Sequence, residues 1–60
     1  SRPSGILGEI YESMPVGTPV SADFFAGLSA SSGELVGHLS MLEVMGYITS
    51  APGGTYLREI

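Results

Sequence analysis

A helix with recognisable start and stop signals, followed directly by two short strands, constrains the fold of this chain most strongly. Ser31 and Glu34 form a capping box of the S-x-x-E type just ahead of an apolar run. The run places three leucines on one helical face: Leu35, Leu39 and Leu42. Gly46 stands where a left-handed residue ends a helix, and Tyr47 can pack back on the last turn, as in a Schellman motif. The pattern predicts a helix that begins near Ser31 and ends before Gly46.

The residues after this helix have the composition of a β-hairpin. Tyr47–Ser50 and Thr55–Leu57 are rich in β-branched and aromatic residues, and Ala51–Gly54 between them has the composition of a turn. The sequence therefore predicts a strand, a tight turn and a returning strand.

The first part of the chain contains a second amphipathic helix. Five apolar residues recur at the spacing of one helical face: Ile6, Leu7, Ile10, Tyr11 and Met14. Ser4 can cap this helix, and Pro15 ends it because proline disfavours a helical residue before it.

The segment between these two helices predicts a turn, a short extended stretch and one further helix. The turn and the extended stretch cover Val16–Val20. Ser21 is a good N-cap, Asp23 suits the first turn, and Val20 with Phe25 can form a hydrophobic staple. The stripe expected to be buried consists of Phe24, Phe25 and Leu28.

The resulting order is typical of a winged helix-turn-helix, a mainly α fold with three helices and a small β-hairpin wing. A chain of 60 residues forms one domain at most, and a domain of this size buries only about 60% of the surface that its unfolded chain exposes. We expect a linker at residues 1–5 and the winged-helix domain at residues 6–60.

The charge balance argues against a protein that tracks phosphates. The chain has no lysine, two arginines (Arg2 and Arg58) and six carboxylates, whereas nucleic-acid affinity depends on several Lys or Arg contacts that release counterions. It also lacks cysteine, which excludes disulfides and fits a reducing compartment. No apolar run is long enough to cross a membrane, so we expect a cytoplasmic location without membrane contact.

No group of residues predicts catalysis, a metal site or a cofactor. His38 is the sole histidine, and a metal site would need further ligands. Glu9 and Glu12 fit the solvated side of the first helix better than an acid–base pair. We therefore expect a protein that is not an enzyme.

Recognition is the remaining function class. With the three leucines buried, the outward face of the helix before Gly46 carries Gly33, Val36, Gly37, Ser40 and Val44. This face has no Arg, Lys, Asn or Gln to read a base edge. It therefore suits contact with a protein through Val36, Gly37, Ser40 and Val44, and an ordinary exposed face without a partner is the alternative.

Several motifs together resemble the C-terminal domain of the bacterial DNA-processing protein A family (DprA, also called Smf). They are Leu42–Ile48, Pro52–Gly54 followed by Tyr56, and Thr18–Val20 ahead of the second predicted helix. The similarity covers roughly residues 6 to 58. Each motif alone is generic, and their joint order and spacing carry the resemblance.

The resemblance implies an accessory module of a protein that acts in DNA uptake and natural transformation. In that family a Rossmann-like domain binds single-stranded DNA and helps to load the RecA recombinase. The implied partners of this module are that parent domain or the recombinase machinery, with weak or no DNA binding of its own. Any weak nucleic-acid contact would come from the wing, through Gly53, Gly54, Thr55, Tyr56 and Arg58. One alternative is the DNA-binding winged helix of a transcription regulator or of an unrelated nucleic-acid enzyme. The other is a structural cap without a partner.

Overall fold

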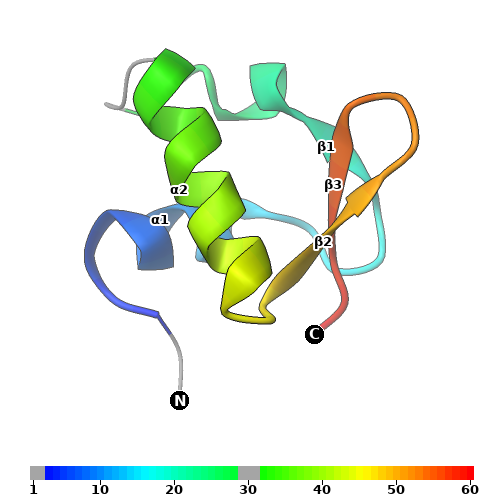
Figure 1. Cartoon of the computed structure of the whole chain (residues 1–60), viewed down its shortest axis with the longest axis horizontal. Helices are drawn as coiled ribbons and strands as arrows, with labels where there is room; N and C mark the ends of the chain where they lie inside the picture. The colour runs from blue at the N-terminus through cyan, green and yellow to red at the C-terminus, as the bar shows by residue number, and fades with distance from the viewer. Residues whose placement is uncertain (1–2, 29–31) are drawn as a thin grey trace.

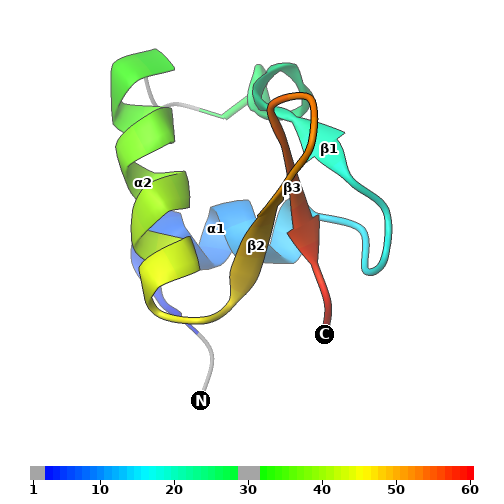
Figure 2. The same cartoon turned by 45° about the vertical axis from the view of Figure 1, so that its right-hand side comes forward.

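The computed structural model describes residues 3–28 and 32–60. This part of the chain contains two α-helices and a three-stranded antiparallel sheet, and the helices pack on one side of the sheet (Figures 1 and 2). In chain order the elements are α1 (Gly5–Ser13), β1 (Val20–Ser21), the 3₁₀ turn η1 (Ala22–Phe25), α2 (Ser32–Val44), β2 (Ile48–Ala51) and β3 (Thr55–Arg58).

Helix α1 ends as the sequence predicts, whereas its start lacks the expected side-chain cap. Met14 at the C-cap has extended backbone angles (φ −80°, ψ 133°), because the Pro15 ring disfavours a helical residue before it. Ser4 occupies the N-cap position, but its side chain makes no capping hydrogen bond. Its carbonyl oxygen accepts the first hydrogen bond of the helix, from the Gly8 amide at 3.3 Å, as any N-cap residue does. Packing of the apolar face, rather than a side-chain cap, therefore holds this helix.

The end of α2 confirms the predicted Schellman motif. Gly46 has a φ of +88°, a left-handed conformation that glycine adopts without a steric penalty. The Tyr47 amide donates to the Leu42 carbonyl at 3.0 Å, and the Gly46 amide donates to the Glu43 carbonyl at 3.0 Å. The capping box predicted for the start of this helix involves Ser31, which lies outside the described residues.

The predicted hairpin is confirmed and gains a third strand. β2 and β3 pair antiparallel with Ala51 opposite Thr55 and Ile48 opposite Arg58, and Gly53 and Gly54 form the turn at positive φ. β1 then pairs with the other edge of β3, which gives the order β1–β3–β2. The last strand of the described chain is thus the central strand of the sheet.

The prediction of three helices plus a wing is wrong. Where a second helix was expected from Ser21, the chain forms only the four-residue turn η1. The segment is short, and Gly27 follows η1 closely. Short helices depend on packing for their stability, yet only one of the two aromatic side chains here is buried: Phe25 lies in the core and Phe24 is 47% exposed. Leu28, the third residue of the predicted stripe, is half-buried and packs against the core from beyond η1. With one fully buried side chain the segment forms one tight turn, for which 3₁₀ geometry is common.

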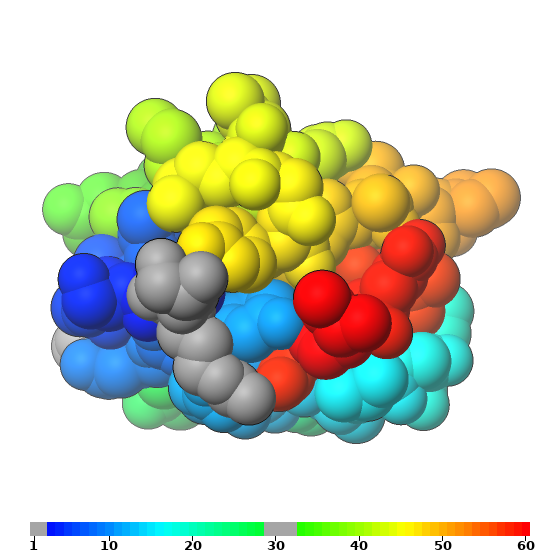
Figure 3. Space-filling model, turned by 90° about the horizontal axis from the view of Figure 1, so that it is seen from below, coloured from blue at the N-terminus to red at the C-terminus, as the bar shows by residue number. Residues whose placement is uncertain are grey.

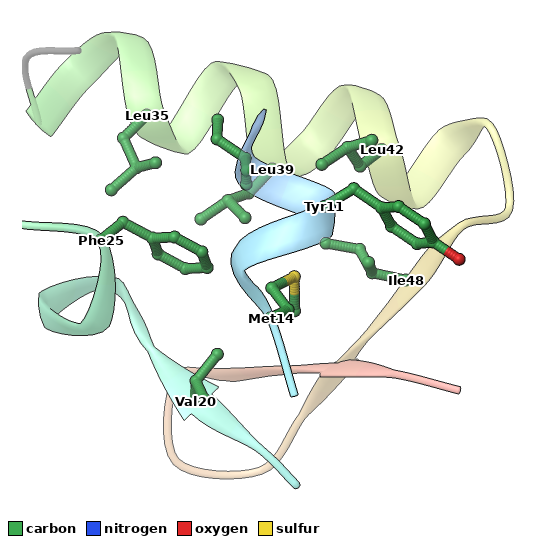
Figure 4. Packing of buried hydrophobic residues seen from close by; sticks show 9 residues of the cluster. Tyr11, Met14, Val20, Phe25, Leu35, Leu39, Leu42 and Ile48 are labelled. Carbon is green, nitrogen blue, oxygen red and sulfur yellow. The ribbon is translucent and has the colours of Figure 1, made fainter. Parts of the chain in front are cut away.

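One hydrophobic core joins the helices to the sheet (Figure 4). Its buried residues are Ile10, Tyr11, Met14, Val20, Phe25, Leu35, Leu39, Leu42 and Ile48. All three leucines predicted for the inner face of α2 are among them. Because they point into the core from one side of α2, the opposite side of this helix faces outward.

Candidate protein-interaction face

The outward side of α2 carries all four residues predicted to contact a protein. Val36, Gly37, Ser40 and Val44 are exposed, and the exposed fraction reaches 50% at Val36 and 83% at Val44. The C-terminal turns of α2 stand out from the surface in the view from below (Figure 3). The structure therefore brings these four residues together on one accessible surface.

Two further exposed residues, Gly33 and Met41, extend this surface. Met41 is 50% exposed and follows Gly37 by four residues, as Gly37 follows Gly33. Met41 was missed in the sequence analysis, although its spacing from the two glycines places it on the same side of a helix. We refer to the six residues as the α2 outer face: Gly33, Val36, Gly37, Ser40, Met41 and Val44.

The α2 outer face contains no charged residue, and carboxylates border it. The helical spacing puts Glu34 at one edge and Glu43 at the other, and both residues are exposed. The Glu43 carboxylate accepts a hydrogen bond from the Ser50 hydroxyl at 2.8 Å, which ties this edge to β2. The face is therefore a neutral strip between two negative margins.

Neither glycine of the α2 outer face is required by the fold around it. Among the residues that the structure describes, none lies within 4 Å of a Cβ atom added at Gly33 or Gly37, and neither glycine has a positive φ. Glycine in a helix interior costs about 1 kcal/mol relative to alanine. The internal packing of the chain gives no compensating gain at Gly37, the more interior of the two.

The predicted wing contacts lie in the hairpin, away from α2 (Figure 1). Gly53 and Gly54 are exposed at its turn. Thr55 is half-buried, and its hydroxyl donates to the Pro52 carbonyl at 3.1 Å. Tyr56 is half-buried and packs against the core. The structure therefore does not bring the wing residues and the α2 outer face together.

Arg58, predicted as a contact residue of the wing, is buried. Its side chain is only 8% exposed, and Nη1 donates to the main-chain oxygens of Tyr11 (3.0 Å) and Met14 (3.1 Å) at the end of α1. Its Nε donates to the Ile60 oxygen at 2.7 Å, and its Cζ lies 4.2 Å from the centroid of the Tyr11 ring. Arg58 is thus a structural link between β3 and α1, and we remove it from the set of contact residues.

The reason for this burial is the register of the hairpin. Arg58 pairs with Ile48, which is buried, and directly paired residues project from the same face of a sheet. The segment after α1 also packs against this strand, because the Gly17 amide donates to the Arg58 carbonyl at 2.8 Å. Figure 3 shows the last residues of the chain beside this segment. The predicted turn, Ala51–Gly54, would have placed Arg58 opposite Tyr47. In the structure Ala51 already pairs with Thr55, and this shift by one residue sets Arg58 opposite Ile48.

The titratable residues considered in the sequence are scattered in the structure. In residues 3–28 and 32–60 no group of three or more His, Cys, Asp or Glu side chains could hold a metal ion. His38 is half-buried, and Glu9 and Glu12 are both exposed on α1. None of the helices in this part of the chain is long and apolar enough to cross a membrane.

Comparison with known proteins gives no relative. No protein-family model, no curated protein and no solved structure matches the chain. The resemblance to the DNA-processing protein A family therefore stays a prediction that depends on the sequence motifs alone.

Proposed function

We propose that this chain is a protein-interaction module that binds its partner through the α2 outer face. The observation that carries the proposal is the neutral, apolar character of an exposed helix side. Val36, Met41 and Val44 are each at least half exposed on it. A helix that is apolar on both its inner and outer sides is typical of a helix covered on both sides. The inner side of α2 packs on the core, so its outer side is the part left for a partner.

Nucleic acid is a poor partner for this surface. Arg58 is the sole Lys or Arg residue in the described part of the chain, and its guanidinium is turned inward onto main-chain oxygens. A protein that binds phosphates needs several exposed cations. The outer face of α2 also lacks the amide and guanidinium groups that read base edges. These features favour a protein partner over the DNA-binding role of a transcription regulator.

We further propose that the module belongs to a DNA-processing protein of the DprA type. The motifs Leu42–Ile48 and Pro52–Gly54 support this assignment, and they coincide with the helix end at Gly46 and the hairpin turn. The parent chain would then handle single-stranded DNA and load the recombinase in the cytoplasm. This module would contact the parent's DNA-binding domain or the recombinase machinery, without catalysis of its own.

Site-specific photo-crosslinking in cells tests the interaction module. A photoreactive residue at Val44 of the full-length protein should give a discrete protein adduct. The same residue at Thr18, which is exposed in the loop before β1, serves as the control and should give none. Equal adducts at both positions, or none at either, would contradict the proposal.

A DNA titration tests the alternative directly. The labelled chain is titrated with duplex and with single-stranded DNA at low salt, and its amide NMR signals are followed. We expect no saturable shifts in α2 or in the hairpin turn. Micromolar binding that weakens steeply with added salt would overturn the interaction module in favour of a nucleic-acid-binding domain.

A further inference from the structure

The α2 outer face has the ridge and groove pattern of a surface that packs against another helix. Residues four apart in a helix form ridges, and two helices pack when the ridges of one enter the grooves of the other. Val36, Ser40 and Val44 form one such row. The neighbouring row contains Gly33, Gly37 and Met41, so its first two positions carry no side chain. The face therefore presents a ridge beside a groove that opens at Gly37.

The groove is open because residue 37 is a glycine, although the surrounding described residues leave room for a side chain there. A Cβ at Gly37 would meet nothing within 4 Å, and glycine lowers helix stability relative to alanine. Close approach of a second backbone is the packing situation that favours glycine at such a position. This observation concerns shape, and it is independent of the apolar character on which the proposed function rests.

The charges around the face identify its occupant. Glu34 and Glu43 border it on opposite sides, and the chain has a net charge of −4. A second copy of this chain would set carboxylate margins against carboxylate margins, and such like-charge contacts disfavour association. A helix with Lys or Arg on both sides of its packing row would instead meet each margin with the opposite charge.

We infer that the α2 outer face binds an α-helix of a different protein, and that this helix crosses α2 at Gly37. The bound helix has small or apolar residues in its packing row and basic residues on both flanks. This inference rests on the proposed function, because it names the partner chemistry for the same face. Its tests separate helix shape and charge from protein binding in general.

The probe is a hydrocarbon-stapled helical peptide with an alanine and leucine packing row and lysines on both flanks. A matched peptide carries glutamates in place of the lysines. We expect the lysine peptide to shift the amide NMR signals of residues 33–44, and its Kd to be at least tenfold lower than that of the glutamate peptide. The preference should fall as salt is added.

Two variants test the groove itself. Gly37→Leu should weaken binding of the lysine peptide at least tenfold without lowering Tm, because leucine favours helix and nothing lies near the position. Thr18→Leu, at an exposed position outside α2, is the matched control and should bind as the parent chain does. Gly37→Leu fills the groove and should be at least as stable as the parent chain. Weaker binding by this variant therefore reports a lost contact and not a lost fold.

Four results would overturn the inference: no binding of the lysine peptide at millimolar concentration, equal binding of both peptides, unchanged binding by Gly37→Leu, or a stable dimer of the chain in sedimentation. If Val44 forms its crosslink in cells but the lysine peptide does not bind, the interaction module stands and only the basic-helix partner fails. If neither is seen, both fail.

Discussion

Replacement of Arg58 by methionine should remove a large part of the stability of this chain. Methionine keeps an unbranched side chain of similar length next to Tyr11, so the substitution removes the guanidinium and little of the packing. It leaves the main-chain oxygens of Tyr11 and Met14 without the donor that now reaches them at 3.0 and 3.1 Å. The Nε bond to Ile60 and the cation–π contact with the Tyr11 ring are lost as well.

The magnitude follows from opposing contributions. Hydrogen bonds from a charged donor contribute about 1.5–3 kcal/mol each, and the contact with the Tyr11 ring adds about 1 kcal/mol. Burial of the guanidinium costs several kcal/mol. The balance for Arg58→Met is a loss of about 3 kcal/mol. A chain of 60 residues has a total stability of only about 3–9 kcal/mol, so the loss takes a third or more of it.

Thermal and urea unfolding followed by circular dichroism measure this loss. For a domain of this size each kcal/mol shifts Tm by about 4–8 °C, so Tm should fall by about 12–24 °C. Arg58→Lys should lie between the parent and Arg58→Met, because one ammonium group does not reach all three acceptors. Glu59→Gln, at an exposed neighbouring position, is the control and should unfold as the parent does. A Tm for Arg58→Met within about 4 °C of the parent would refute the structural role of Arg58.

Three further substitutions test other parts of the fold. Leu39→Ala removes a completely buried side chain and should destabilise the chain by about 2–5 kcal/mol in urea unfolding; a loss below about 1 kcal/mol would contradict the packing. Gly46→Ala places a side chain at a φ of +88° and should cost about 1–2 kcal/mol, whereas an unchanged urea midpoint would exclude the left-handed helix end. Gly8→Ala puts a Cβ 2.6 Å from the Pro3 carbonyl oxygen; the amide NMR signals around Pro3 should shift, and an unchanged spectrum there would contradict this close approach.

Local signals predicted the elements that depend on neighbouring residues. The helix end at Gly46 and the turn at Gly53 and Gly54 both require positive φ, and glycine marks such positions in a sequence. The spacing of Leu35, Leu39 and Leu42 likewise predicted which side of α2 is buried, and therefore which side is exposed. The candidate site was found for this reason, because an outer face follows from an inner one.

The errors concern residues whose state depends on distant partners. The aromatic pair Phe24 and Phe25 was expected to be buried as one stripe, yet the two rings pack edge to face at 5.2 Å and only Phe25 enters the core. Arg58 was predicted as a contact residue of the wing. Its burial depends on carbonyl oxygens supplied by α1, more than forty residues earlier in the chain. Local composition does not contain that information.

The position of β3 between β1 and β2 has a consequence for how the chain is made. The segments of α1, β1, α2 and β2 leave the ribosome before β3 does. Because β1 and β2 each pair with β3, the sheet cannot form until Thr55–Arg58 has left the exit tunnel. Arg58, which anchors the end of α1, emerges at the same late stage. Until then α1 lacks the hydrogen bonds that Arg58 donates to its last turn, and β1 lacks the strand with which it pairs. The sheet is therefore completed only by the strand that is synthesised last among its three.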